Sequence, residues 1–186
     1  PVETLSATLT ITSQHDTRYE QPDETVIVDI DTVTNADEDG EQQGTATILD
    51  DDDQPTVTLS VTGSPMAEDG GEATVTATLS NLSVEEVTVN LAFDGTATGG
   101  GTDYTSSGAS ITIAAGDWSN SITLTSVPDE LYEGEDDETI VVDITGVTNG
   151  TEDGEQQVTA TITENDPVPT VTLELTDSPL AEAGGG

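Results

Sequence analysis

Cationic side chains are almost absent from this chain, which has a single Lys or Arg, Arg18, against 39 Asp and Glu and a formal net charge of −38. A surface of this sign repels nucleic acid and anionic lipid, so we expect no nucleic-acid partner and no direct insertion into a membrane. Repulsion among so many carboxylates also destabilises a compact fold unless cations bind to it. A metal ion is therefore the first partner to expect.

Cysteine is absent and histidine occurs once, at His15. The lack of cysteine excludes disulfides and thiolate metal sites, so the chain offers a metal only hard oxygen ligands. It also excludes a Cys nucleophile, and no Gly-x-Ser-x-Gly turn supplies a serine in its place. We therefore expect a protein that is not an enzyme.

Aromatic residues make up 3% of the chain, and no apolar run approaches the roughly 18 residues of a membrane helix. Paired carboxylates could serve glycoside hydrolysis, but that chemistry also needs a cleft with aromatic side chains that stack on sugars. Trp118 is the single candidate platform, and we expect it to cover the end of the core. Because the chain begins at Pro1 without a signal peptide, we expect it to be an internal piece of a longer protein.

A repeat of about 114 residues organises what is present. Residues 23–52 and 137–166 are identical at twenty of thirty positions, and Pro55–Leu59 recurs as Pro169–Leu173 at the same offset. This period is far longer than that of a solenoid, so each unit should have its own core. The expected domains are 1–53, the C-terminal half of one repeat; 54–166, a complete repeat; and 167–186, the first strand of a third.

Short segments in which Thr and Val alternate, separated by turn residues, are typical of β-strands with one buried face. Seven of them, near 55–62, 72–80, 86–93, 109–114, 120–126, 138–145 and 156–163, occupy the complete repeat. They predict an all-β fold, an immunoglobulin-like seven-stranded antiparallel β-sandwich. The half-repeat should supply three strands with an exposed apolar face, which a longer parent chain or strand complementation by another copy would cover.

Acidic residues are concentrated in loops that such a sandwich places at one end. Because successive strands run in opposite directions, the loops after 55–62, 86–93 and 120–126 share a pole with the exit from 156–163. These loops carry Glu68, Asp103, Asp129, Glu130, Glu133, Glu138, Glu164 and Asp166. The corresponding acids of the half-repeat are Asp16, Glu20, Glu24, Asp50, Asp51, Asp52 and Asp53.

Converging carboxylates favour Ca²⁺ as the cofactor. Two carboxylates about 4 Å apart repel by roughly 1 kcal/mol in bulk water, and by more as the effective dielectric constant falls. Ca²⁺ accepts about six to eight oxygen ligands in flexible geometry, which suits acids gathered from several loops, whereas Mg²⁺ demands octahedral order. The alternative is a solvated acidic coat that keeps the protein soluble.

Four motifs then carry a resemblance to a known family: Gly99–Tyr104, Ile113–Asp117, Pro128–Glu138 and Thr159–Asp166. In this combination the sequence resembles Calx-β domains, which occur in sodium/calcium exchangers, in an integrin cytoplasmic tail and as arrays in bacterial surface proteins. The resemblance implies a seven-stranded sandwich whose metal-binding members hold several Ca²⁺ ions among the pole loops. It places Glu68, Asp103, Asp129, Glu133, Glu138 and Asp166 at acidic positions of that pattern.

The sequence also departs from the family pattern. Metal-binding members often have three Asp before the strand near 138–145 and three more after the last strand, where this chain has Pro128-Asp-Glu130 and Glu164-Asn-Asp166. In the half-repeat, Thr17 and Arg18 replace Glu130 and Leu131, but the exit, Asp50–Asp53, matches better. These departures leave the number of ions open.

We therefore predict a calcium-binding structural or extender module of a long, repetitive, extracellular or cell-surface protein, such as an adhesin, surface fibre or matrix component. Its partners are neighbouring repeats of the same chain, and Ca²⁺ rigidifies the junctions because Asp50–Asp53 run directly into the next strand at Pro55. The alternative is a Ca²⁺-dependent recognition module that binds a glycan or a partner protein. A cytosolic Ca²⁺ sensor is disfavoured by the charge and the close repetition.

Overall fold

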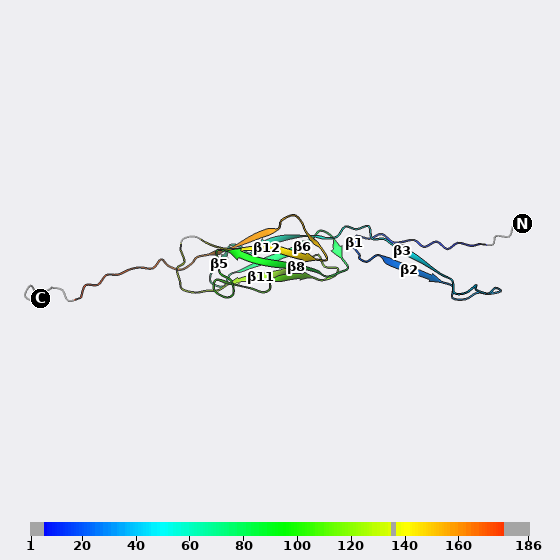
Figure 1. Cartoon of the computed structure of the whole chain (residues 1–186). Helices are drawn as coiled ribbons and strands as arrows, with labels where there is room; N and C mark the ends of the chain where they lie inside the picture. Colours follow the sequence, from blue (N-terminus) through cyan, green and yellow to red (C-terminus); the bar gives the residue numbers. More distant parts are fainter. Residues whose placement is uncertain (1–5, 135–136, 177–186) are drawn as a thin grey trace, which may run out of the picture.

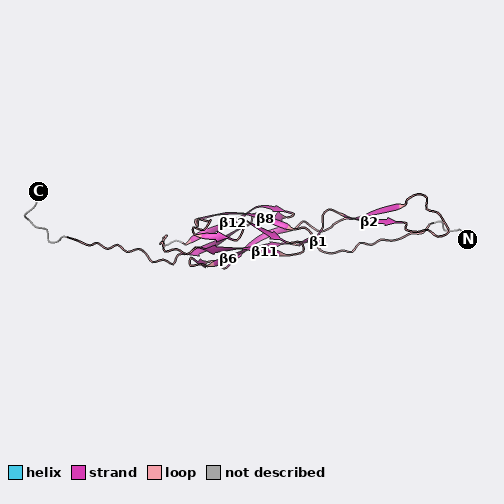
Figure 2. Cartoon of the chain, turned by 90° about the horizontal axis from the view of Figure 1, so that it is seen from below, coloured by secondary structure: helices cyan, strands magenta, loops and turns pink. Residues whose placement is uncertain are grey.

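The computed structural model describes residues 6–134 and 137–176. All regular structure in these residues is β, in two five-stranded sheets and two two-stranded sheets (Figures 1 and 2). In this part of the chain there is no helix long and apolar enough to cross a membrane. The all-β class and the sandwich-like arrangement are confirmed, whereas the immunoglobulin-like connectivity and the tandem arrangement stay predictions.

Two sheets enclose a single core within residues 55–163. The first has the order β13-β4-β6-β11-β9, with β13 at Thr151–Glu152, β4 at Thr56–Thr62, β6 at Glu72–Leu79, β11 at Ser119–Ser126 and β9 at Tyr104–Ser106. The second has the order β10-β8-β12-β14-β5, with β10 at Ser110–Ile113, β8 at Val87–Gly95, β12 at Glu138–Thr148, β14 at Gln157–Thr163 and β5 at Met66–Ala67.

Alternation along the strands explains the core. In β6, Val75 is fully buried while its neighbours Thr74 and Thr76 are partly exposed. In β12, Val142 is fully buried between partly exposed neighbours. Side chains of both sheets meet in one cluster, so the two inner faces form one apolar layer.

The seven predicted segments correspond to β4, β6, β8, β10, β11, β12 and β14 within a few residues. Within the complete repeat the prediction missed β5, β9, β13 and β7 (Leu82–Ser83), because strands of two or three residues carry no alternation that a sequence can show. It was also wrong in making the sandwich purely antiparallel, since β13 pairs with β4, and β5 with β14, in parallel. Trp118 does not cover the core, because its side chain is 53% exposed.

The N-terminal segment forms β1 (Arg18–Tyr19) and a hairpin of β2 (Glu24–Asp29) with β3 (Gln43–Ile48). This hairpin corresponds to β12 and β14 at the 114-residue offset, and the two share their turn geometry. Asn35 and Asn149 both have positive φ, of 62° and 59°. Both turns also hold the same bond from a glutamine amide to an aspartate carbonyl, Gln42 to Asp39 and Gln156 to Asp153, at 2.6 Å.

Not all the strands predicted at the two ends of the chain are present. Residues 6–12, the counterpart of most of β11, form no strand, because β11 is held by β6 and β9 and no such partners pair with 6–12 in the described residues. Residues 167–176, expected as the first strand of a third repeat, also form none, and 177–186 lie outside the described residues. Figure 1 shows the hairpin and this C-terminal segment leaving the sandwich at opposite ends.

The N-terminal segment joins the sandwich through β7 (Leu82–Ser83), in the turn between β6 and β8. Strand β1 pairs with β7 in parallel, with Arg18 opposite Leu82 and Tyr19 opposite Ser83. The backbone N–H of Val84 donates to the carbonyl of Tyr19 at 3.2 Å. The β6–β8 turn is therefore the surface that the N-terminal segment contacts.

Candidate metal centre

Six acids from four separate segments of the chain meet at one pole of the sandwich. Two groups of three each have carboxylate oxygens that lie within 4.8 Å of one another. We call them the first triad, Glu68, Glu164 and Asp166, and the second triad, Asp103, Glu133 and Glu138. The structure thus brings together the acids that the alternation of loops had predicted to share a pole.

Backbone hydrogen bonds position the most deeply buried members. Glu68 is 6% exposed, its N–H donates to the carbonyl of Thr163 at 3.3 Å, and its Oε2 accepts from the N–H of Asn165 at 3.4 Å. Asp103 is 9% exposed, and its Oδ2 accepts from the N–H of Thr98. The loop that follows β5 is therefore fixed to the end of β14, and the loop that follows β8 is closed on itself by the bond between Thr98 and Asp103. Both loops hold these carboxylates at the rim of the core.

Glu164 ties the remaining loops to one another. Its Oε2 accepts from the N–H of Glu133 and its Oε1 from the N–H of Asp166, both at 2.7 Å. These bonds favour the charged form and hold the pKa of Glu164 below its usual value. The loop between β11 and β12 is thereby connected to the segment that leaves β14.

Most other acids of the pole resist ionisation. Burial, and then the charges of Asp103, Glu133 and Glu68, raise the pKa of Glu138 from 4.5 to about 7. Burial, followed by neighbouring carboxylates, also raises the pKa of Glu133 and Asp166. The same two causes raise the pKa of Glu68, although its bond from Asn165 acts in the opposite direction. A fully ionised pole is therefore unfavourable until a cation balances it.

The donor set fits a calcium ion. Every ligand candidate of the two triads is a carboxylate oxygen, the type that Ca²⁺ prefers. Oδ2 of Asp166 is buried and has no hydrogen-bond partner among the described residues. A buried polar atom without a partner is costly, and a bound cation would satisfy it.

Asp129 and Glu130 lie at the edge of this pole. Both side chains are exposed and neither belongs to a triad. Oδ1 of Asp129 accepts from the N–H of Leu131 at 2.7 Å, so this carboxylate organises its own loop. Their charges contribute to the raised pKa of Asp166. Of the eight acids predicted in the complete repeat, these two are the ones outside the triads.

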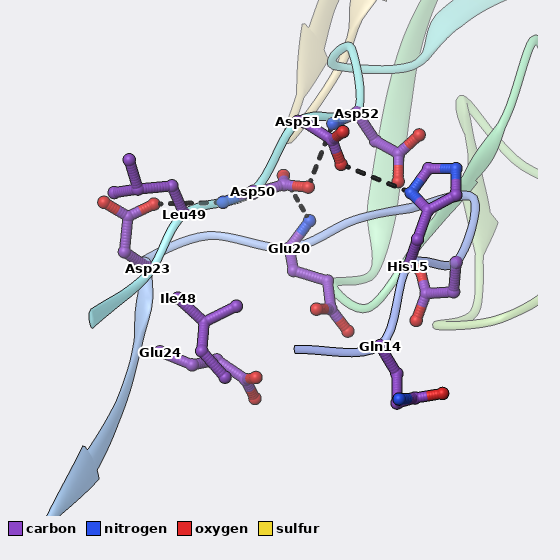
Figure 3. A pocket seen from close by; sticks show the side chains of 11 residues that line it. Gln14, His15, Glu20, Asp23, Glu24, Ile48, Leu49, Asp50, Asp51 and Asp52 are labelled. Atoms are coloured by element: carbon purple, nitrogen blue, oxygen red, sulfur yellow. Dashed lines mark hydrogen bonds and ion pairs between the residues drawn. The ribbon is translucent and has the colours of Figure 1, made fainter. Parts of the chain in front are cut away.

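A second acidic pocket lies in the N-terminal segment, and Figure 3 shows it from close by. Its lining includes Asp16, Glu20, Glu24, Asp50, Asp51 and Asp52, together with Asp23 and His15. Asp53, which was predicted with these acids, is not among the residues that line the pocket. No three acids of this pocket bring carboxylate oxygens within 4.8 Å of one another, so it is looser than the pole.

The pocket repeats the hydrogen bonds of the pole. The carboxylate of Asp50 accepts from the N–H of Glu20 at 2.8 Å and from the N–H of Asp52 at 3.1 Å, as Figure 3 shows. Asp50 therefore stands where Glu164 stands in the complete unit. Oδ1 of Asp16 accepts from the N–H of Arg18 at 2.9 Å, as Asp129 accepts from Leu131. Burial and the neighbouring acids, Asp16 first, raise the pKa of Glu20.

Sequence reasoning missed two residues of this pocket. Oδ1 of Asp23 accepts from the N–H of Asp50 at 3.4 Å, and Nδ1 of His15 lies 3.5 Å from Oδ1 of Asp51. A signal for Asp23 was present, since it directly precedes the predicted ligand Glu24. His15 gave none, because a single histidine in a loop is compatible with any surface.

The family model of the Calx-beta domain matches residues 50–168, more than half of the chain. A comparison with curated proteins gives no match.

Proposed function

The chain belongs to the Calx-beta domain family, and on that premise we propose that it is a calcium-binding structural module of a long, repetitive, extracellular protein. The family is a non-catalytic β-sandwich family associated with calcium-binding, extracellular modules. In this proposal the module extends an adhesin, surface fibre or matrix component, and Ca²⁺ stiffens the junctions between repeats.

One observation carries the calcium proposal: six carboxylates from four segments of the chain meet in two triads, with a buried Asp166 oxygen that has no hydrogen-bond partner among the described residues. Glu68, Glu164 and Asp166 would hold an ion against the end of β14, and Asp103, Glu133 and Glu138 would hold one beside the start of β12. When bound, Ca²⁺ supplies positive charge that several carboxylates can share. Glu164 connects the two groups through its bonds to Glu133 and Asp166.

The extender role rests on the position of the second pocket. Asp50, Asp51 and Asp52 line it and are separated from the sandwich strand β4 by three residues, Asp53–Pro55. Because these candidate ligands also belong to the linker, a metal ion that fixes them also fixes the linker that leads to the next unit. Without a cation, the adjacent carboxylates repel one another and the linker loosens.

A calcium titration by calorimetry, combined with thermal unfolding, tests the metal site. Ca²⁺ should raise the melting temperature, because a ligand that binds only the folded state contributes about 2.7 kcal/mol at a hundredfold excess over Kd. Glu68→Gln with Asp166→Asn should remove most of this shift. Glu155→Gln, an exposed acid at the opposite pole, is the matched control and should keep it. An equal loss in both would support a solvated acidic coat instead.

A recognition module is the second candidate, and the exposure of Trp118 favours it. This side chain is 53% exposed at the pole opposite the triads, where it offers a flat aromatic face to a glycan or a protein. Binding to a glycan array that Trp118→Ala abolishes would support recognition. If the protein binds no glycan either with or without Ca²⁺, the result would favour the structural role.

A further inference from the structure

The pairing of β1 with β7 shows how a loop of one unit contacts the next. Strand β1 is the middle of the Asp16–Glu20 segment, and β7 lies in the β6–β8 turn, which we define as Asn81–Val84. A second contact supports the pairing, because the side-chain amide of Asn81 donates to the carbonyl of Asp53 in the linker. The contact uses mainly backbone groups, so it depends little on the side chains of β1.

The sandwich carries a second copy of this edge. Its segment Asp129–Glu133 aligns with Asp16–Glu20, which places Leu131–Tyr132 where Arg18–Tyr19 form β1. Both segments make the same two hydrogen bonds. The N–H of the third residue, Arg18 or Leu131, donates to the carboxylate of the first aspartate. The N–H of the last glutamate, Glu20 or Glu133, donates to the acid that follows the final strand, Asp50 or Glu164. Leu131–Tyr132 therefore has the local backbone arrangement of β1 without belonging to a strand.

This second edge is open. Leu131 is 64% exposed, and neither backbone group of Tyr132 has a hydrogen-bond partner among the described residues. The linker has the same length as at the first junction, since two residues separate Asp52 from Pro55 and two separate Asp166 from Pro169. Pro167 stands where Asp53 stands, and a proline still offers the carbonyl that Asn81 uses.

We propose that Leu131–Tyr132 is a docking edge for the β6–β8 turn of a second copy of the module 54–168. Docking in the register of β1 and β7 places Leu131 opposite Leu82 and Tyr132 opposite Ser83. It buries an exposed leucine against another leucine and gives the carbonyl of Tyr132 the N–H of Val84. In the 186-residue chain the β6–β8 turn is already paired with β1, so the occupant is a copy whose turn is free. The inference rests on the repeat arrangement and not on bound metal.

Engineered cysteines can test the edge, because the chain has none of its own. The protein is extended so that residue 168 is followed by a second copy of 55–168, which keeps the sequence unchanged through Leu173 because Pro55–Leu59 and Pro169–Leu173 are identical. Leu131→Cys in the first copy and Leu82→Cys in the second should form a disulfide under mild oxidation, since neighbouring strands lie at a distance that suits one. The 186-residue chain with Arg18→Cys and Leu82→Cys is the positive control.

The matched collision control pairs Leu131→Cys with Asp94→Cys, a position in the second copy at the other end of β8. The Leu131–Leu82 pair should crosslink about tenfold faster than this control, because docking raises the effective concentration. Equal rates would overturn the proposal. In the cysteine-free extended protein, slow amide exchange at Val84 of the second copy is expected, and fast exchange would also contradict docking. Both measurements are made in Ca²⁺ and in chelator, with calcium affinity measured separately, so failure of docking is distinct from failure of metal binding.

Discussion

At the scale of single residues, the same position of the repeat meets two environments. Val142 in β12 is fully buried, whereas Val28, its counterpart in β2, is only partly buried because no second sheet covers the hairpin within residues 6–134 and 137–176. Glu164 and its counterpart Asp50, in contrast, make the same contacts in the two environments, because each accepts hydrogen bonds from two backbone N–H groups. Local hydrogen bonds are therefore the same with and without a core, whereas the burial of an apolar side chain, and the stability it contributes, depends on the core.

The valine pair gives a matched test of that difference. Val142→Ala should lower the free energy of unfolding by about 2 kcal/mol, because two buried methyl groups are lost and a cavity remains. Val28→Ala should change it by less than about 0.5 kcal/mol, as is usual for substitutions outside a core. Urea unfolding of both variants measures the two effects. Similar losses would mean that the hairpin is packed against a partner.

Glu138 should make stability depend on pH in the absence of calcium. Its pKa is raised from 4.5 to about 7, first by burial and then by Asp103 and Glu133. Because the folded state holds this proton more tightly than the unfolded chain, stability is greatest below pH 4.5 for this group and falls as the pH rises towards 7. In chelator, the melting temperature should therefore decrease over this window.

Glu138→Gln should reduce that decrease, since the amide does not titrate, whereas Glu155→Gln should leave it unchanged. Melting curves at several pH values give both slopes. If Glu138→Gln keeps the full slope of the unchanged chain, the pH dependence belongs to other carboxylates.

At the scale of elements, β2–β3 and β12–β14 are two hairpins of nearly the same sequence with different support. Strand β12 pairs with both β8 and β14, and its inner face lies on the core. Strands β2 and β3 pair only with each other among the described residues. An isolated two-stranded hairpin is marginally stable in water.

Hydrogen exchange should separate the two hairpins. Amides of β12 and β14 are expected to exchange at rates set by global unfolding, and those of β2 and β3 much faster, through local opening. The two hairpins give matched strand positions for the comparison, residues 24–29 with 138–143 and residues 43–48 with 157–162. Equal protection in β2–β3 would show that another strand, such as that of a neighbouring copy, completes this sheet.

At the scale of the whole molecule, charge and shape act together. The chain carries a net charge of −38. The acidic pocket of Figure 3 contains Asp50, Asp51 and Asp52, which lie in the segment between β3 of the hairpin and β4 of the sandwich. Repulsion among these carboxylates opposes a fixed arrangement at this junction, where two residue pairs of β1–β7 and the bond from Asn81 to Asp53 hold the hairpin segment to the sandwich. A cation in the pocket would reduce that repulsion.

Small-angle scattering should detect the change. At constant ionic strength, Ca²⁺ is expected to narrow the distance distribution of the chain, and chelator should broaden it. Asp50→Asn with Asp52→Asn should remove the calcium response, while Glu155→Gln should retain it. An identical scattering profile in Ca²⁺ and in chelator would mean that metal binding does not stiffen the junction.

The amino-acid sequence by itself determined the all-β class, the seven long strands and the acids that share a pole, because alternation and the up-and-down order of strands are local or follow from chain order. Tertiary structure alone decided that β5, β9 and β13 exist, that residues 6–12 form no strand and that the acids divide into two triads. It also decided the role of Glu164 and the pairing of β1 with β7. Short bridges and side-chain contacts depend on which backbone groups are left unpaired where distant segments meet, and no local pattern records that.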